Sequence, residues 1–93
     1  MVDQNRASLS LTVRNRQEIL FEGDIYALAS TNEIGDFSVL AEHANFISII
    51  NEGLRVIKLD ASELQFPVTL GLLKIWENKA EVFLDVMFQN MTK

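Results

Sequence analysis

The most constraining feature of the sequence is a repeated alternation of apolar and polar residues with a period of two. Residues 8–14 show it most clearly, since Leu9, Leu11 and Val13 fall on one face of the segment. This alternation is typical of a half-buried β-strand, because successive side chains of a strand point to opposite faces of the sheet. The opening segment therefore predicts a strand with one face in a core.

Similar apolar runs follow along the chain, separated by turn signals about every 8–12 residues. The run at 25–29 is apolar on both faces, which predicts a strand covered on both sides. Pro67 indicates an edge strand or a bulge, because proline has no N–H for the ladder. A helix over residues 19–29 is the weaker alternative, since Gly23 interrupts it. Strands are predicted at 19–21, 25–29, 37–40, 53–59, 63–69, 72–76 and 80–86, and a strand or an extended turn at 46–50.

These about eight to ten short strands predict an all-β fold, a small β-sandwich or flattened barrel whose strands are mostly antiparallel. A chain of 93 residues supports one modest core. The chain has no cysteine, so neither disulfides nor a cysteine-based zinc site contribute to its stability.

Composition excludes several classes of function. The net charge of -5 disfavours binding to phosphate backbones, so no nucleic-acid partner is expected. No apolar run approaches the ~20 residues of a membrane span, and the N-terminus lacks the apolar segment of a signal peptide. We therefore expect a soluble intracellular protein.

The sequence offers little for catalysis, and we expect no catalytic residue, metal site or cofactor. His43 is the single histidine, and no nucleophile motif or metal-ligand spacing accompanies it. It is interpreted as a loop residue with one hydrogen bond, or else as a partner contact. The four glycines are too far apart for a phosphate-binding loop and suit turns and strand ends. A non-catalytic interaction domain is the better interpretation.

The order of these motifs resembles the N-terminal β-sandwich of the ATP synthase epsilon subunit, over residues 8–86. The alternating strand precedes Phe21-Glu22-Gly23, the counterpart of a Phe-x-Gly segment. A loop motif of the family is matched by Gly35-Asp36-Phe37-Ser38-Val39-Leu40-Ala41-Glu42-His43-Ala44-Asn45, and its most specific part is the block from Gly35 to Ala44. Later motifs are matched by Gly53, Thr69-Leu70-Gly71-Leu72-Leu73 and Val82-Phe83-Leu84-Asp85. Ser38, Ala41, Asn45 and Leu70 depart from family glycines and prolines, which predicts a less rigid or differently shaped loop.

The resemblance implies a non-catalytic subunit of the central stalk of a proton- or sodium-translocating ATP synthase. Such a subunit links the gamma subunit to the membrane c ring and helps to couple ion flow to ATP synthesis. It implies a peripheral position on the cytoplasmic face of the cell inner (plasma) membrane, with membrane contact only through the complex. The family usually continues into a C-terminal helical hairpin, which is not expected in this chain, and nucleotide binding of that kind is not expected either.

The resemblance also assigns roles to residues. It implies that Gly35, Asp36 and Phe37 face the c ring, whose loops offer polar and basic groups, and that His43 and Thr69 face the gamma subunit. Within the chain it implies an N-terminal extension at 1–7, the sandwich at 8–86 and a tail at 87–93.

Two alternatives remain open at this stage. The chain could be an unrelated β-sandwich interaction adaptor that shares only the architecture, since fold does not determine function. It could also be a small enzyme or ligand-binding barrel, which would need a pocket with converging polar groups.

Overall fold

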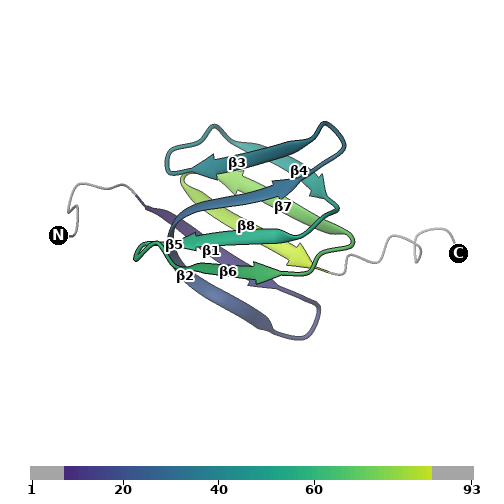
Figure 1. Cartoon of the computed structure of the whole chain (residues 1–93), viewed down its shortest axis with the longest axis horizontal. Helices are drawn as coiled ribbons and strands as arrows, with labels where there is room; N and C mark the ends of the chain where they lie inside the picture. The colour runs from purple at the N-terminus through teal and green to yellow at the C-terminus, as the bar shows by residue number, and fades with distance from the viewer. Residues whose placement is uncertain (1–7, 85–93) are drawn as a thin grey trace, which may run out of the picture.

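The computed structural model describes residues 8–84, and within that range it consists of eight strands and no helix (Figure 1). The all-β prediction is therefore confirmed, and the strand count lies at the lower bound of the predicted range. The predicted extension at 1–7 and tail at 87–93 lie outside the described residues. The strands are β1 (Leu9–Arg14), β2 (Ile19–Thr31), β3 (Asp36–Leu40), β4 (Phe46–Ile50), β5 (Leu54–Lys58), β6 (Glu63–Phe66), β7 (Gly71–Trp76) and β8 (Lys79–Leu84).

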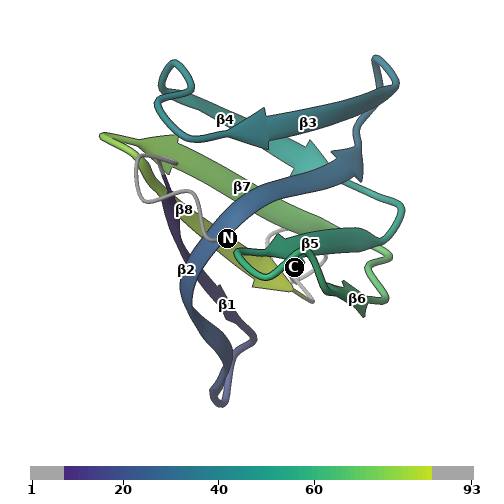
Figure 2. The ribbon, with the colours of Figure 1, turned by 60° about the vertical axis from the view of Figure 1, so that its left-hand side comes forward.

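The strands form one folded-over sheet in the order β4-β7-β8-β1-β2-β5-β6, with β3 also paired to β2. All described pairings are antiparallel except that of β1 with β8. Strand β2 joins the two layers, because its first half pairs with β1 and its second half with β3 and β5 (Figure 2). The sheet does not close, as expected of the sandwich.

The prediction of two strands at 19–21 and 25–29 was wrong, since β2 is one strand of 13 residues. Gly23 pairs with Leu11 in the ladder and does not interrupt the strand. A Cβ at Gly23 would lie 3.6 Å from Cζ of Phe21, so the Phe21 ring occupies the space beside the missing side chain. Tertiary packing therefore outweighs the low strand propensity of glycine.

The predicted coverage of both faces of residues 25–29 is confirmed in part: the neighbours Ala27 and Leu28 are both buried, whereas Tyr26 is 37% exposed. The register against β5 shifts between Ile25 and Ala27. This irregularity lets Ile25 and Leu28 both point into the core although they are three residues apart. The continuous apolar run therefore reflects a bulge that changes the inward-facing positions.

Strand β6 lies at the end of the sheet order, which confirms the edge position predicted from Pro67. The strand ends at Phe66, directly before that proline, and not at residue 69 as predicted. At the β7–β8 hairpin, Glu77 and Asn78 have φ of 49° and 63°, and Lys79 already pairs with Trp76. The positive φ angles suit the two-residue turn of a twisted hairpin.

Inward-facing residues of seven strands form the core between the two layers, and most are fully buried. Partly buried aromatic rings such as Phe37 and Phe46 pack at its margin. No helix of residues 8–84 is long and apolar enough to cross a membrane. The buried cluster comprises Leu9, Leu11, Val13, Ile25, Leu28, Val39, Ile50, Leu54, Val56, Leu73, Ile75, Ala80, Val82 and Leu84.

Candidate partner-binding site around the β2–β3 hairpin

The hairpin between β2 and β3 is a tight turn held by hydrogen bonds of one asparagine. Asn32 and Gly35 exchange two backbone hydrogen bonds of 3.1 Å. The Asn32 side-chain oxygen also accepts from the N–H groups of Ile34 and Gly35, at 2.9 and 3.2 Å. Its amide nitrogen donates to Ser48 Oγ of β4 at 3.0 Å. The sequence Asn-Glu-Ile-Gly therefore forms a braced tip, as expected of an Asx turn.

Gly35 has a φ of 143°, a backbone conformation that side chains with a Cβ rarely adopt. No atom lies within 4 Å of the place where its Cβ would stand. Glycine is therefore needed at this position for the path of the backbone out of the turn, and crowding does not require it.

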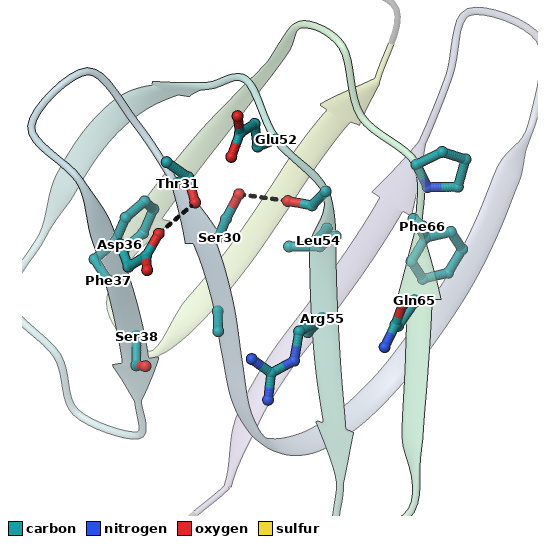
Figure 3. Close-up of a pocket in the computed structure, with 13 residues that line it drawn as sticks. Ser30, Thr31, Asp36, Phe37, Ser38, Glu52, Leu54, Arg55, Gln65 and Phe66 are labelled. Carbon is teal, nitrogen blue, oxygen red and sulfur yellow. Dashed lines mark hydrogen bonds between the residues drawn. The ribbon is translucent and has the colours of Figure 1, made fainter.

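Asp36 is exposed at the first position of β3, and its carboxylate accepts a hydrogen bond of 2.8 Å from Thr31 Oγ1 (Figure 3). Thr31 is also its partner in the β2–β3 ladder. The bond fixes the direction of the carboxylate and leaves a second carboxylate oxygen for other partners. The structure therefore places Asp36 as an oriented negative charge on the surface.

Asp36 borders a groove of about 640 Å³ that runs over β2 between β3 and the β5–β6 pair. Its charged side chains are Asp36, Glu52 and Arg55 (Figure 3). Arg55 Nε donates to Oε2 of Glu63, which does not line the groove, at 2.6 Å. Ser30 is buried at the floor of the groove, and its hydroxyl donates to the Gly53 carbonyl at 2.6 Å. That hydroxyl is engaged in this bond, and the single histidine of the chain, His43, does not line the groove, so no histidine activates a serine there.

On the other side of β3, a hollow of about 320 Å³ is lined by Gly35, Asp36, Phe37 and His43. Phe37 packs edge-on against Phe46 with ring centroids 6.0 Å apart, and His43 lies 4.9 Å from the same ring. His43 Nδ1 lies 2.7 Å from the Ala44 carbonyl, which only accepts, so Nδ1 is the donor. The structure therefore brings together four of the five residues predicted from the sequence.

Thr69 is exposed on the β6–β7 connection and lines neither the groove over β2 nor the hollow beside His43. In the β4–β7 ladder, Phe46 pairs with Ile75 and Ile50 pairs with Gly71. His43 precedes Phe46, whereas Thr69 precedes Gly71. The two residues predicted to face the gamma subunit therefore lie at opposite ends of this ladder.

Sequence reasoning missed the apolar residues beside the hairpin. Ile34 at the tip is 91% exposed, and Ile47 and Ile49 on β4 are 64% and 47% exposed. These three side chains line a hollow of about 480 Å³ between the tip and β4. The available signal was an isoleucine between Glu33 and Gly35, in a segment that otherwise contains only polar residues and glycine.

Within residues 8–84, no group of three or more histidine, cysteine or acidic side chains is placed to hold a metal ion. The described side chains also leave no buried polar atom without a hydrogen-bond partner.

Comparison with known proteins identifies the family. The model of the β-sandwich domain of the ATP synthase delta/epsilon chain matches residues 8–90. The chain therefore belongs to the ATP synthase delta/epsilon chain family. The resemblance inferred from the Gly35–Ala44 block is confirmed by this match. It also argues against the alternative that the chain shares only an architecture with the family.

Curated relatives carry the same family name. The chain is similar to the ATP synthase epsilon chain of Protochlamydia amoebophila (strain UWE25), with 30% identity over 78 residues. It is 28% identical over 78 residues to the ATP synthase epsilon chain of Sulfurovum sp. (strain NBC37-1). These alignments cover 83% of this chain but 53% and 61% of the two relatives. The chain thus spans about half to three fifths of their length.

Solved structures share the fold. A chain in the Euglena gracilis mitochondrial ATP synthase structure, which contains OSCP, F1 and the c-ring, matches with a TM-score of 0.79 and 14% identity. The match covers 92% of this chain and 60% of that one. A chain from the central stalk and c-ring of the Tetrahymena thermophila enzyme matches at 0.72 and 13% identity, covering 82% and 62%. At this identity the likeness establishes the fold.

Proposed function

We propose that this chain is a non-catalytic rotor subunit of an F-type ATP synthase, linking the gamma subunit to the c ring. The observation that carries this proposal is the family match, which extends over residues 8–90 and so includes the whole described sandwich. In this role the subunit passes rotation driven by proton or sodium flow toward the catalytic head. Its place is the cytoplasmic face of the inner (plasma) membrane, reached only through the complex.

A rotor subunit must transmit torque without deforming, and the close-packed core suits that work. The central strands β1 and β2 each pair on two sides, and fully buried side chains from both layers fill the space between them. Interiors of this kind have low compressibility and transmit strain. The sandwich therefore serves as a stiff body, while its loops make the contacts with neighbouring subunits.

The contact residues keep the roles that the family pattern implies. Gly35 and Asp36 face the c ring, with the Asp36 carboxylate held in place by Thr31. Phe37 faces the c ring beside them, and its aromatic ring also packs edge-on against Phe46. His43 and Thr69 face the gamma subunit as two separate contacts, since they lie at opposite ends of the β4–β7 ladder.

The proposal is tested in the assembled enzyme of the same cell. We expect the full chain to co-purify with the gamma subunit and the c ring in mild detergent. Asp36→Lys should reduce coupled ATP synthesis several-fold, because a fixed negative charge at the ring contact becomes positive. Its effect on folding stability should stay within about 0.5 kcal/mol, as is usual for exposed loop positions.

Asp24→Lys is the matched control, since Asp24, like Asp36, is an exposed aspartate. Asp24 lies on β2, where it pairs with Ser10 of β1. This variant makes the same charge change away from the β2–β3 hairpin and should leave coupling unchanged. If the chain co-purifies with neither subunit, the proposed function is wrong. If Asp36→Lys and Asp24→Lys behave alike, the assignment of the hairpin to the ring is wrong.

A further inference from the structure

The hairpin tip displays an apolar side chain on a rigid support. Ile34 is 91% exposed, more than any other large hydrophobic side chain of residues 8–84. Its backbone N–H donates to Asn32, which also binds Gly35 and reaches across to Ser48. A braced backbone loses little conformational freedom on binding, so an apolar side chain that it displays is suited to serve as an anchor.

The tip continues into a small apolar patch. Ile47 and Ile49 point outward from β4 and line the same hollow as Ile34. We call these three residues the isoleucine patch. Single exposed apolar side chains are common on protein surfaces, but three that border one hollow indicate an interaction site.

Carboxylates predominate among the described charges around the isoleucine patch. Glu33 lies at the tip, Asp36 follows it on β3, and Glu52 lies on the β4–β5 connection. That connection lies beside the hairpin, since the Asn51 N–H donates to the Thr31 carbonyl at 3.0 Å. The connections 32–35, 51–53 and 67–70 at this end contain no lysine or arginine. A partner that covers this end therefore places lysine or arginine side chains opposite three carboxylates, because complementary charge favours encounter and register.

One lysine lies beside the patch in the sheet, since Lys74 pairs with Ile47 in the β4–β7 ladder. Its ammonium group lies 4.6 Å from the centroid of the Trp76 ring, two residues further along β7. Strand β7 begins at Gly71, which pairs with Ile50 near the hairpin, and Trp76 lies at the opposite end of the strand. The contact with Trp76 therefore directs the Lys74 ammonium group away from the hairpin. One lysine against three carboxylates leaves the border of the isoleucine patch with a net negative charge.

We infer that Ile34 is the anchor by which this chain docks, and that its partner presents an apolar socket bordered by basic side chains. This inference rests on the proposed function, which makes the partner the c ring, since Ile34 directly precedes the ring-facing residues Gly35 and Asp36. Ile47 and Ile49 then widen the apolar contact, and the carboxylates fix its orientation. The inference assigns the ring contact a defined apolar centre in addition to the charge of Asp36.

The test measures binding of the full chain separately to the detergent-purified c ring and to the gamma subunit of the same cell. We expect Ile34→Ser to weaken binding to the ring by about tenfold or more, as is usual for a central anchor. Binding to the gamma subunit should not change. Ile34→Leu should retain most of the ring affinity, and Leu59→Ser, at a side chain 45% exposed on the β5–β6 turn, should change neither affinity.

The salt dependence of binding tests whether basic side chains border the partner's apolar socket. Binding of the wild-type chain to the ring should weaken as salt is raised, because ion pairs at a solvent-exposed rim are screened. The double variant Glu33→Gln, Glu52→Gln should reduce this dependence. Thermal unfolding of each variant shows whether the fold is kept, and an unchanged melting temperature with weaker ring binding supports the anchor role.

The outcomes separate this inference from the proposed function. If the wild-type chain binds neither the ring nor the gamma subunit, the proposed function fails and the inference fails with it. If the wild-type chain binds both and Ile34→Ser binds the ring equally well, only the inference is overturned. It is also overturned if Ile34→Ser loses the gamma subunit instead, or if the variant merely converts a dimer of this chain to a monomer.

Discussion

The two ends of the sandwich are both held by asparagine side chains, but in different ways. At the hairpin end, around the β2–β3 turn, Asn32 binds mainly backbone groups two and three residues away. At the far end, around the β3–β4 loop and the β7–β8 turn, Asn78 accepts from the Glu42 N–H at 2.7 Å and donates to the Ser8 carbonyl at 2.6 Å. Asn45 accepts from the Glu77 N–H at 3.0 Å. These partners are 32 to 70 residues apart.

Asparagine side chains therefore have two structural roles in this sandwich. Local bonds stiffen one turn, so the hairpin end presents Ile34 to a partner on a braced tip, and the bond from Asn32 to Ser48 ties that tip to β4. Long-range bonds join separate loops, so the far end becomes part of the body of the sandwich. The β3–β4 loop, where Ala41 and Asn45 stand in place of family prolines, is held by such bonds.

The largest expected effect comes from the core that both ends share. Leu84→Asp places a carboxylate at a position that is 7% exposed in β8. A buried, unpaired charge is among the few changes that cost more than about 4–5 kcal/mol, and a domain of this size has only about 5–14 kcal/mol in total. Circular dichroism should therefore show loss of the folded state at both ends together. A folded Leu84→Asp variant would contradict this placement of the core.

A smaller effect should separate the two ends. Asn78→Ala loses two long-range hydrogen bonds and puts alanine at a φ of 63°, so unfolding should become easier by about 2–3 kcal/mol. Asn78→Gly tolerates that φ and isolates the loss of the bonds. Asn32→Ala is the matched variant at the hairpin end and should cost only about 1 kcal/mol. Urea denaturation measures all three, and an Asn32→Ala cost equal to or above that of Asn78→Ala would refute the comparison.

The smallest effect concerns the β5–β6 turn at the far end. The pKa of Asp60 is lowered from its ordinary value of 3.8, first because the Ser62 hydroxyl donates to the carboxylate and then because the Ser62 N–H does. Since the folded-state pKa is below the unfolded one, this contribution to stability is present above pH 3.8 and is lost as the pH falls through the folded value.

Ser62→Ala removes the first cause, so the pKa of Asp60 should rise toward 3.8 while staying below it. An NMR titration of the Asp60 carboxyl carbon measures the change. Ser38→Ala, on the exposed side of β3, is the control and should leave the Asp60 titration unchanged. An unchanged pKa in Ser62→Ala would mean that the hydroxyl does not orient this turn.

Much of the fold could be predicted from the pattern of residues, because strand alternation and turn residues act locally. The strands at β1, β3 and β4 and the edge position of β6 follow from such patterns. The single long β2 could not be predicted, because Gly23 is compensated by Phe21 and the bulge at Ile25–Ala27 depends on pairing with β5. Both require contacts that exist only in the folded sheet.

The candidate site was partly predictable for a similar reason. The block around Asp36 and His43 was recognised from the order of its motifs, since that order is a property of the sequence. The exposure of Ile34, Ile47 and Ile49 around one hollow was not, because Ile34 and the β4 residues are brought together by the bond from Asn32 to Ser48. The separation of His43 from Thr69 likewise follows from the β4–β7 register.

By itself the sequence determined the all-β class, the single small core and the membership of the ATP synthase delta/epsilon chain family, because periodicity and motif order do not depend on distant contacts. Only the tertiary structure decided which apolar residues are buried and which are displayed. Leu28 and Ile34 are both apolar, yet one is fully buried and the other is 91% exposed. The bulge in β2, which forms in the pairing with β5, directs Leu28 into the core, and the turn braced by Asn32 displays Ile34.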